Sequence, residues 1–134
     1  MLPEWLGLGK PKILVVDDDP AVSSLVTDVL ETQGYRVETV ADGQEALNRL
    51  KKEKFALVIL DVHMPKLEGP QALEVIRLMP GGKEIGIIML TSESNTGTLM
   101  HAYEQGVFAY IPKPFSPAKL IEKVSVYFDQ KKSK

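Results

Sequence analysis

Three aspartates stand side by side near the start of the chain, directly after a short apolar run. In KILVVDDDP, residues 12–20, they are Asp17, Asp18 and Asp19. Adjacent carboxylates repel one another, so without a cation we expect one of them to have a raised pKa. A hard divalent cation such as Mg²⁺ or Mn²⁺ offsets the repulsion, because it takes carboxylate oxygens as ligands. The stretch predicts a metal site at Asp17 and Asp18, with Asp19 better suited to capping a helix.

Other polar residues follow apolar runs in the same way. Asp61 ends LVILD, Thr91 follows IGIIML, and Lys113 follows VFAYIP. A carboxylate can act as a nucleophile and carry a phosphoryl group as an acyl phosphate, and Asp61 ends the most apolar run. The cation, Thr91 and Lys113 would each balance one phosphoryl oxygen. The chemistry that these residues predict is phosphoryl transfer, driven by positioning and charge stabilisation.

These residues meet only if the apolar runs are parallel strands, whose carboxyl ends share one edge of a sheet. Short β-branched or apolar runs predict five strands, at residues 12–16, 35–41, 55–60, 85–90 and 107–111. Helical patterns alternate with them and predict five helices, from residue 20, from about 43, over 70–78, over 95–105 and from 116–117. This alternation predicts the α/β class, with helices on both faces of a parallel sheet.

Two helix starts are marked by their residue types. Asp19 before Pro20 is typical of an N-cap, and Asp42 with Glu45 forms a plausible capping pair. The apolar stripes of the first and third helices include Leu25 and Val75, which we expect in the core.

Composition bounds the remaining classes. The 134 residues suit one domain, and a net charge of −2 argues against nucleic-acid or membrane partners. The absence of cysteine excludes disulfides and thiolate sites and fits a cytoplasmic protein. No apolar run approaches the roughly 18 residues that span a bilayer. We expect an N-terminal arm at 1–10, the domain at 11–130 and a flexible basic tail at 131–134.

Four stretches in this order, ILVVDDDP, LVILDVHMP, MLTSES and YIPKPF, resemble the receiver domain of bacterial two-component response regulators, the family of the chemotaxis regulators. The resemblance covers roughly residues 11–130. It implies a flavodoxin-like, doubly wound (βα)5 fold with a five-stranded parallel sheet of order 2-1-3-4-5. That order is the one known for chemotaxis members, so it follows from the resemblance and not from the residues alone.

The resemblance assigns roles to individual positions. Asp61 matches the aspartate that accepts a phosphoryl group from a histidine kinase or phosphotransfer protein. Asp17, Asp18 and Asp61, with the backbone carbonyl of His63, match the ligands of Mg²⁺ or Mn²⁺. His63 and Glu93 occupy the positions that tune dephosphorylation in the family.

Other positions match the parts that respond to phosphorylation. Thr91 matches the switch hydroxyl, Lys113 the lysine that pairs with the phosphoryl group, and Tyr110 the aromatic switch residue. The Lys113–Pro114 peptide bond matches one that is usually cis. Ala109 departs from an aspartate common in the family, and Pro112 suits an exposed strand edge.

The function implied is that of a signalling receiver, which catalyses only its own phosphorylation and dephosphorylation. Phosphorylation would change the face formed by the helix at 95–105, the strand at 107–111 and the last helix. That face would then signal a downstream protein, and a homodimer formed on phosphorylation is compatible with this reading.

Two other readings stay open at the level of the residues. An aspartyl-phosphate phosphatase-like hydrolase would also pair an aspartate with Mg²⁺, but usually has a second aspartate where this chain has His63. A flavin mononucleotide binder would need a hydroxyl- and glycine-rich loop where this chain has Asp17 to Asp19.

Overall fold

The computed structural model describes residues 11–62, 69–91 and 106–132, and within them the predicted sheet is confirmed. All five strands are parallel and lie in the order β2-β1-β3-β4-β5. The strands are β1 (Lys12–Val16), β2 (Arg36–Val40), β3 (Leu57–Asp61), β4 (Gly86–Thr91) and β5 (Ala109–Pro112). Because β1 and β3 are neighbours in the sheet, the chain reverses its direction of winding there, as in doubly wound folds.

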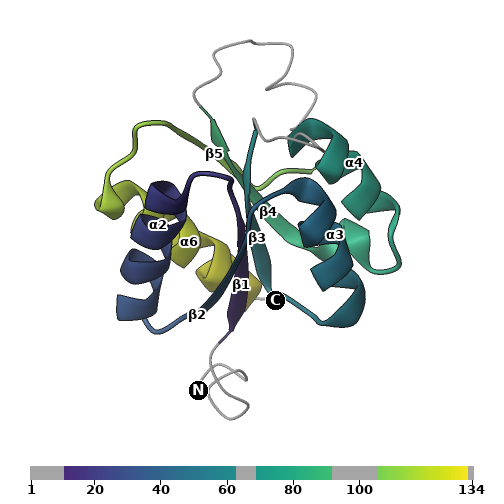
Figure 1. The fold of residues 1–134 in the computed structure, drawn as a ribbon. Helices are drawn as coiled ribbons and strands as arrows, with labels where there is room; N and C mark the ends of the chain where they lie inside the picture. The colour runs from purple at the N-terminus through teal and green to yellow at the C-terminus, as the bar shows by residue number, and fades with distance from the viewer. Residues whose placement is uncertain (1–10, 63–68, 92–105, 133–134) are drawn as a thin grey trace.

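Helices cover both faces of the sheet, α2 and α6 on one side and α3 and α4 on the other (Figure 1). They are α2 (Pro20–Thr32), α3 (Gly43–Lys52), α4 (Gly69–Leu78) and α6 (Pro117–Lys132), with a 3-10 turn, η1, at Gly82–Glu84. The helix predicted over 95–105 lies outside the described residues. Of the predicted tail, Lys131 and Lys132 belong to α6. No helix in the described ranges has the length and apolar content needed to cross a membrane.

The two faces of the sheet bury separate sets of side chains. Leu14 and Val16 of β1 pack in the cluster under α3 and α4, whereas Ile13 and Val15 pack in the cluster under α2 and α6. Every residue of β3 is buried, as expected of a central parallel strand. This packing holds the carboxyl ends of β1, β3 and β4 at one edge of the molecule.

Both predicted capping signals are confirmed. The Ala21 N–H donates to Asp19 Oδ1 at 2.9 Å, at the start of α2. The Glu45 N–H donates to Asp42 Oδ1 at 2.9 Å, and Glu45 Oε2 accepts from the Ala41 N–H at 3.0 Å. These bonds satisfy helix N–H groups that have no partner within the helix.

The prediction that Leu25 and Val75 lie in the core is wrong. Leu25 is 42% exposed and Val75 is 39% exposed, although Val26 and Ile76 beside them are fully buried. A helix that covers a sheet buries a stripe little wider than 100° of its circumference. Adjacent helix residues point 100° apart, so Leu25 and Val75 fall on the solvent side of that stripe.

Candidate metal and phosphoryl site

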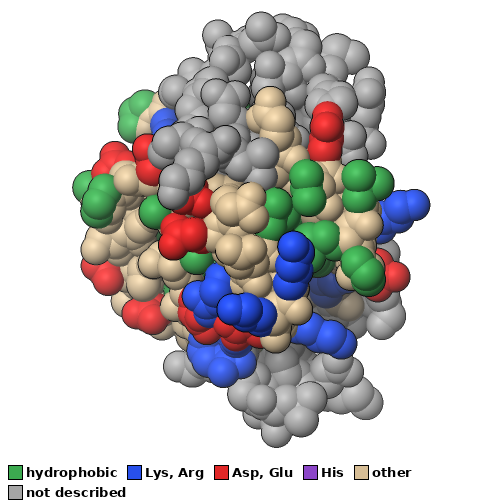
Figure 2. Space-filling view, turned by 45° about the vertical axis from the view of Figure 1, so that its right-hand side comes forward, with side chains coloured by type: hydrophobic (Ala, Val, Ile, Leu, Met, Phe, Trp, Pro, Cys, Tyr) green, Lys and Arg blue, Asp and Glu red, His purple; other side chains and the backbone are tan. Residues whose placement is uncertain are grey.

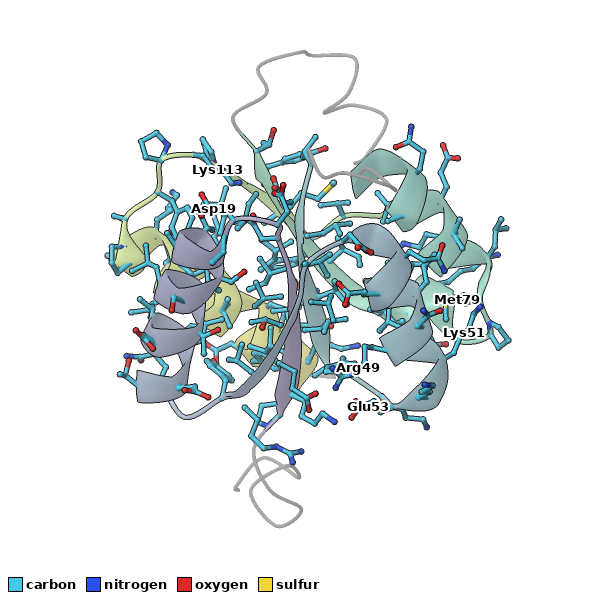
Figure 3. All side chains as sticks on the ribbon, viewed as in Figure 1. Asp19, Arg49, Lys51, Glu53, Met79 and Lys113 are labelled. Carbon is cyan, nitrogen blue, oxygen red and sulfur yellow. The ribbon has the colours of Figure 1, made fainter. Side chains whose placement is uncertain are left out.

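The site lies where the strands end. Asp17 follows β1, Asp61 is the last residue of β3, and Thr91 is the last residue of β4. Lys113 follows β5, and its backbone N–H donates to the Thr91 carbonyl at 2.8 Å. Figure 3 shows Lys113 and Asp19 near the same upper edge, with Arg49 and Glu53 at the opposite edge. The parallel register therefore brings together four residues that are far apart in the chain.

Asp17, Asp18 and Asp61 form an acidic cluster, in which one carboxylate oxygen from each lies within 4.8 Å of the others. Asp17 and Asp61 are buried, while Asp18 is exposed. Three carboxylate oxygens, one of them open to solvent, suit Mg²⁺, which combines a few carboxylates with waters and phosphate oxygens. The donor set therefore fits the predicted ion. The fourth predicted ligand, the carbonyl of His63, lies outside the described residues.

Among the residues that the structure describes, Lys113 is a cation that contacts this cluster. Its Nζ lies 3.1 Å from Asp61 Oδ1 and 3.3 Å from Asp17 Oδ2. The side chains of Asp17 and Asp61 are 0% and 6% exposed, and that of Lys113 is 23% exposed. The Lys113–Pro114 peptide bond is cis. The ammonium thus bridges the carboxylates that follow β1 and end β3.

The pKa of Asp17 is raised, first because burial disfavours its charged form and also because Asp61 is a neighbouring negative charge. The Asp19 N–H and Lys113 oppose the rise in this pKa without cancelling it. For Lys113, burial alone would lower the pKa, but the hydrogen bond to Asp61 and the charges of Asp17 and Asp61 raise it. The contact with Lys113 therefore does not offset the cost of burying the Asp17 charge, and a bound cation would relieve that cost.

The two predicted switch residues lie on neighbouring strands. Thr91 is buried, with 3% of its surface exposed. Tyr110 in β5 is half-buried and packs against the core cluster under α3 and α4. Met89 of β4 lies beside Tyr110 in the sheet register, so Tyr110 is two positions along the strands from the Thr91–Pro112 pair. His63 and Glu93, the predicted tuning residues, lie outside the described ranges.

One supporting feature was not anticipated from the sequence. The Asp19 N–H donates to Asp17 Oδ1 at 2.9 Å, so the backbone at the start of α2 orients the Asp17 carboxylate. The signal was present, since an aspartate side chain commonly accepts a bond from the N–H two residues ahead. Ser23 Oγ adds a bond to the Asp17 carbonyl at 3.3 Å.

An open groove of about 590 Å³ adjoins the cluster on the side of β2. Its walls include Asp17, Asp18, Ser23, Thr39 and Glu45. Asp61, Thr91 and Lys113 are not among its lining residues. The groove is therefore a neighbour of the site and not its centre.

Comparison with known proteins places the chain among signalling proteins. Residues 13–125 match the family model of the response regulator receiver domain. The DNA-binding response regulator MtrA of Mycolicibacterium smegmatis is 33% identical over 86% of this chain and 49% of its own length. The probable transcriptional regulator ycf27 of Cyanophora paradoxa is 41% identical over 84% of this chain and 46% of its own length. The chain thus spans about half the length of these curated relatives.

A solved structure supports the same placement. The chemotaxis response regulator CheY4 of Vibrio cholerae has a TM-score of 0.81 to this chain with 34% identity. The match covers 87% of this chain and 97% of CheY4. Fold and sequence therefore agree over most of both chains.

Proposed function

This chain belongs to the response regulator receiver domain family, a family of signalling modules, and on that premise we propose that it accepts a phosphoryl group on Asp61. The donor is the phosphohistidine of a sensor kinase or of a phosphotransfer protein. The observation that carries the proposal is the position of the buried Asp61 carboxylate, 3.1 Å from Lys113 Nζ and within an acidic cluster that fits Mg²⁺.

In the proposed reaction a carboxylate oxygen of Asp61 forms a bond to phosphorus while the phosphorus–nitrogen bond of the phosphohistidine breaks. The imidazole leaves, and Asp61 carries an acyl phosphate. Mg²⁺ held by Asp17, Asp18, Asp61 and the His63 carbonyl would supply positive charge to the phosphoryl oxygens. Lys113 balances the remaining negative charge, and its contact with both buried carboxylates positions it before the reaction.

The charge change at Asp61 would then alter the switch face, our name for the surface that we expect residues 92–105, β5 and α6 to form. Thr91 and Lys113 would turn to the new phosphoryl oxygens, and the half-buried Tyr110 would follow inward. A local change of charge biases the populations of two conformations, and a downstream protein recognises one of them. Binding to that protein, and not turnover of a substrate, is the proposed output.

Replacement of the acceptor tests the proposal directly. Asp61→Asn is expected to abolish labelling by acetyl phosphate in Mg²⁺, because an amide cannot form the acyl phosphate. Intact mass spectrometry measures the label, with Asp28→Asn on the exposed side of α2 as the control. Labelling of Asp61→Asn at the level of the parent chain would disprove the assignment. Repeated turnover of a phosphate ester by the parent chain would instead favour the hydrolase alternative.

Replacement of an acidic neighbour tests the metal site. Asp18→Ala is expected to weaken Mg²⁺ binding by about tenfold or more, because the cluster loses one of its three carboxylates. Isothermal titration of the metal-free chain with MgCl₂ measures the affinity. An unchanged affinity would remove Asp18 from the ligand set.

A further inference from the structure

Arg77, in the last turn of α4, is a buried cation away from the phosphoryl site. Only 9% of its surface is exposed. Its Nη1 donates to the Gly82 carbonyl at 2.8 Å and to the Ile85 carbonyl at 2.7 Å, and its Nη2 donates to the Gly106 carbonyl at 3.0 Å. One planar guanidinium therefore joins three backbone segments: η1, the start of β4 and the approach to β5.

The three acceptors make this contact strong and specific. Burial lowers the pKa of Arg77, because the charged guanidinium loses its hydration when it leaves water. Charge-assisted hydrogen bonds compensate that loss, and each carbonyl would lack this donor if the side chain were shortened. Lysine cannot substitute fully, because an ammonium lacks the fork that spans two separated groups of acceptors.

The position of Gly106 gives the contact a consequence. Gly106 has a φ of 81° and stands three residues before Ala109, where β5 begins. The Phe108 N–H then donates to the Ile87 carbonyl at 2.8 Å, and β5 with Tyr110 follows. Arg77 thus holds the segment that enters β5, the strand that carries the switch residue Tyr110.

The helix on the other side of the sheet is held at the same place. Gly86, next to Ile85, leaves room for the ring of Tyr127 from α6, since a Cβ there would lie 2.3 Å from that ring. The Tyr127 hydroxyl donates to the Ala56 carbonyl at 3.1 Å. At the amino end of β4, contacts therefore join α4, the segment before β5 and α6.

We propose that Arg77 is a positioning residue for the switch: it fixes the segment that enters β5, at Gly106, so that a charge change at Asp61 moves Tyr110. The inference rests on the proposed function. The phosphoryl site lies at the carboxyl ends of β4 and β5, and Arg77 restrains the segments that enter these strands at their amino ends. When the segment that enters β5 is fixed, a displacement at the carboxyl end of β5 is transmitted along the strand. When that segment is loose, motion near Gly106 absorbs the displacement.

The test uses the full chain labelled with 3-fluorotyrosine, whose Tyr110 ¹⁹F resonance is assigned with Tyr110→Phe. Beryllofluoride with Mg²⁺ stands in for the phosphoryl group, and labelling by acetyl phosphate is measured in parallel. In the parent chain, the mimic is expected to shift the Tyr110 resonance. In Arg77→Met with the mimic bound, the ratio of the shifted to the unshifted Tyr110 resonance is expected to be about fivefold lower than in the parent. Labelling by acetyl phosphate is expected to stay the same.

Two further variants make the result specific. Arg77→Lys keeps the charge, is expected to give an intermediate Tyr110 response, and decides the question if Arg77→Met does not fold. Ile76→Val removes one methyl group from the fully buried neighbour on α4 and is expected to leave the response intact.

The outcomes separate the two proposals. The inference is overturned if the foldable Arg77 variants give the parental Tyr110 response, or if Ile76→Val loses the response equally. A parent chain that takes no label and does not respond to beryllofluoride overturns the proposed function itself.

Discussion

At the scale of single residues, the site is marked by the cost of burying the negative charge of Asp17. Asp17 and Asp61 are both buried, and both contact the one ammonium of Lys113. The raised pKa of Asp17, which comes from burial and then from Asp61, shows that folding disfavours its charged form. Residues that a ligand will later stabilise commonly destabilise the free protein in this way.

This cost predicts that Asp17→Asn stabilises the metal-free chain. A folded-state pKa above the unfolded value contributes stability at low pH that is lost as pH rises through the folded pKa. At pH 7 in EDTA, the free energy of unfolding of Asp17→Asn should therefore exceed that of the parent by about 1 kcal/mol. This gain in the free energy of unfolding should become smaller as the pH is lowered towards the ordinary aspartate pKa of about 3.9.

Urea unfolding followed by circular dichroism at pH 7 and pH 4 measures this gain, with Asp28→Asn, exposed on α2, as the control. Addition of Mg²⁺ should stabilise the parent and not Asp17→Asn. A variant less stable than the parent at pH 7 in EDTA would show that Lys113 already compensates the charge of Asp17.

At the scale of elements, the loops that carry the site are held by helix starts. Asp19 caps α2 and its N–H also orients Asp17, so one residue links the first turn of a helix to the acidic cluster. Asp42 caps α3 next to β2, on the side where the groove lies. The bonds that shape these loops therefore join residues that are close together in the sequence.

The capping pair of α3 predicts a measurable loss. Asp42→Ala should lower the free energy of unfolding by about 1 kcal/mol, because the Glu45 N–H loses its acceptor at a buried helix start. Chemical denaturation measures the change, and Gln44→Ala, at an exposed position in the first turn of the helix, serves as the control. Equal stability of both variants would contradict a capping role for Asp42.

At the scale of the whole molecule, the edge opposite the site is closed by ion pairs. Glu53, after α3, pairs with Lys12 of β1 and with Arg49, and Lys12 lies 3.3 Å from Glu38 of β2. Figure 2 shows basic and acidic side chains mixed at the lower edge of the visible face. Lys12 Nζ also lies 4.8 Å from the centre of the Phe55 ring. This network joins the edge strand to the centre of the sheet and to α3.

The network predicts a pH-dependent contribution from Glu53. Hydrogen bonds from Lys12 and then Arg49 lower its pKa. Stability from a lowered pKa is present above the unfolded value, about 4.3 for glutamate, and is lost as pH falls through the folded pKa. Glu53→Gln should therefore melt at a lower temperature than the parent at pH 7 and at nearly the same temperature at pH 3.

Differential scanning calorimetry at both pH values tests this, with Glu31→Gln, exposed on α2, as the control. High salt should narrow the difference at pH 7, because screening weakens ion pairs near the surface. A difference that persists unchanged at pH 3 would mean that the amide disturbs packing and not charge.

The sequence by itself determined the five strands, the capped starts of α2 and α3 and the residues at the strand ends, because apolar periodicity and capping depend on neighbours along the chain. Asp17, Asp61, Thr91 and Lys113 were identifiable in this way. The tertiary structure alone decided which of them touch, that Asp17 and Asp61 share one ammonium, and that Leu25 faces solvent. It also decided the contacts of Arg77, which in sequence is an ordinary cation in the last turn of a helix. Those properties depend on burial and on contacts between segments distant in the chain, which local patterns do not contain.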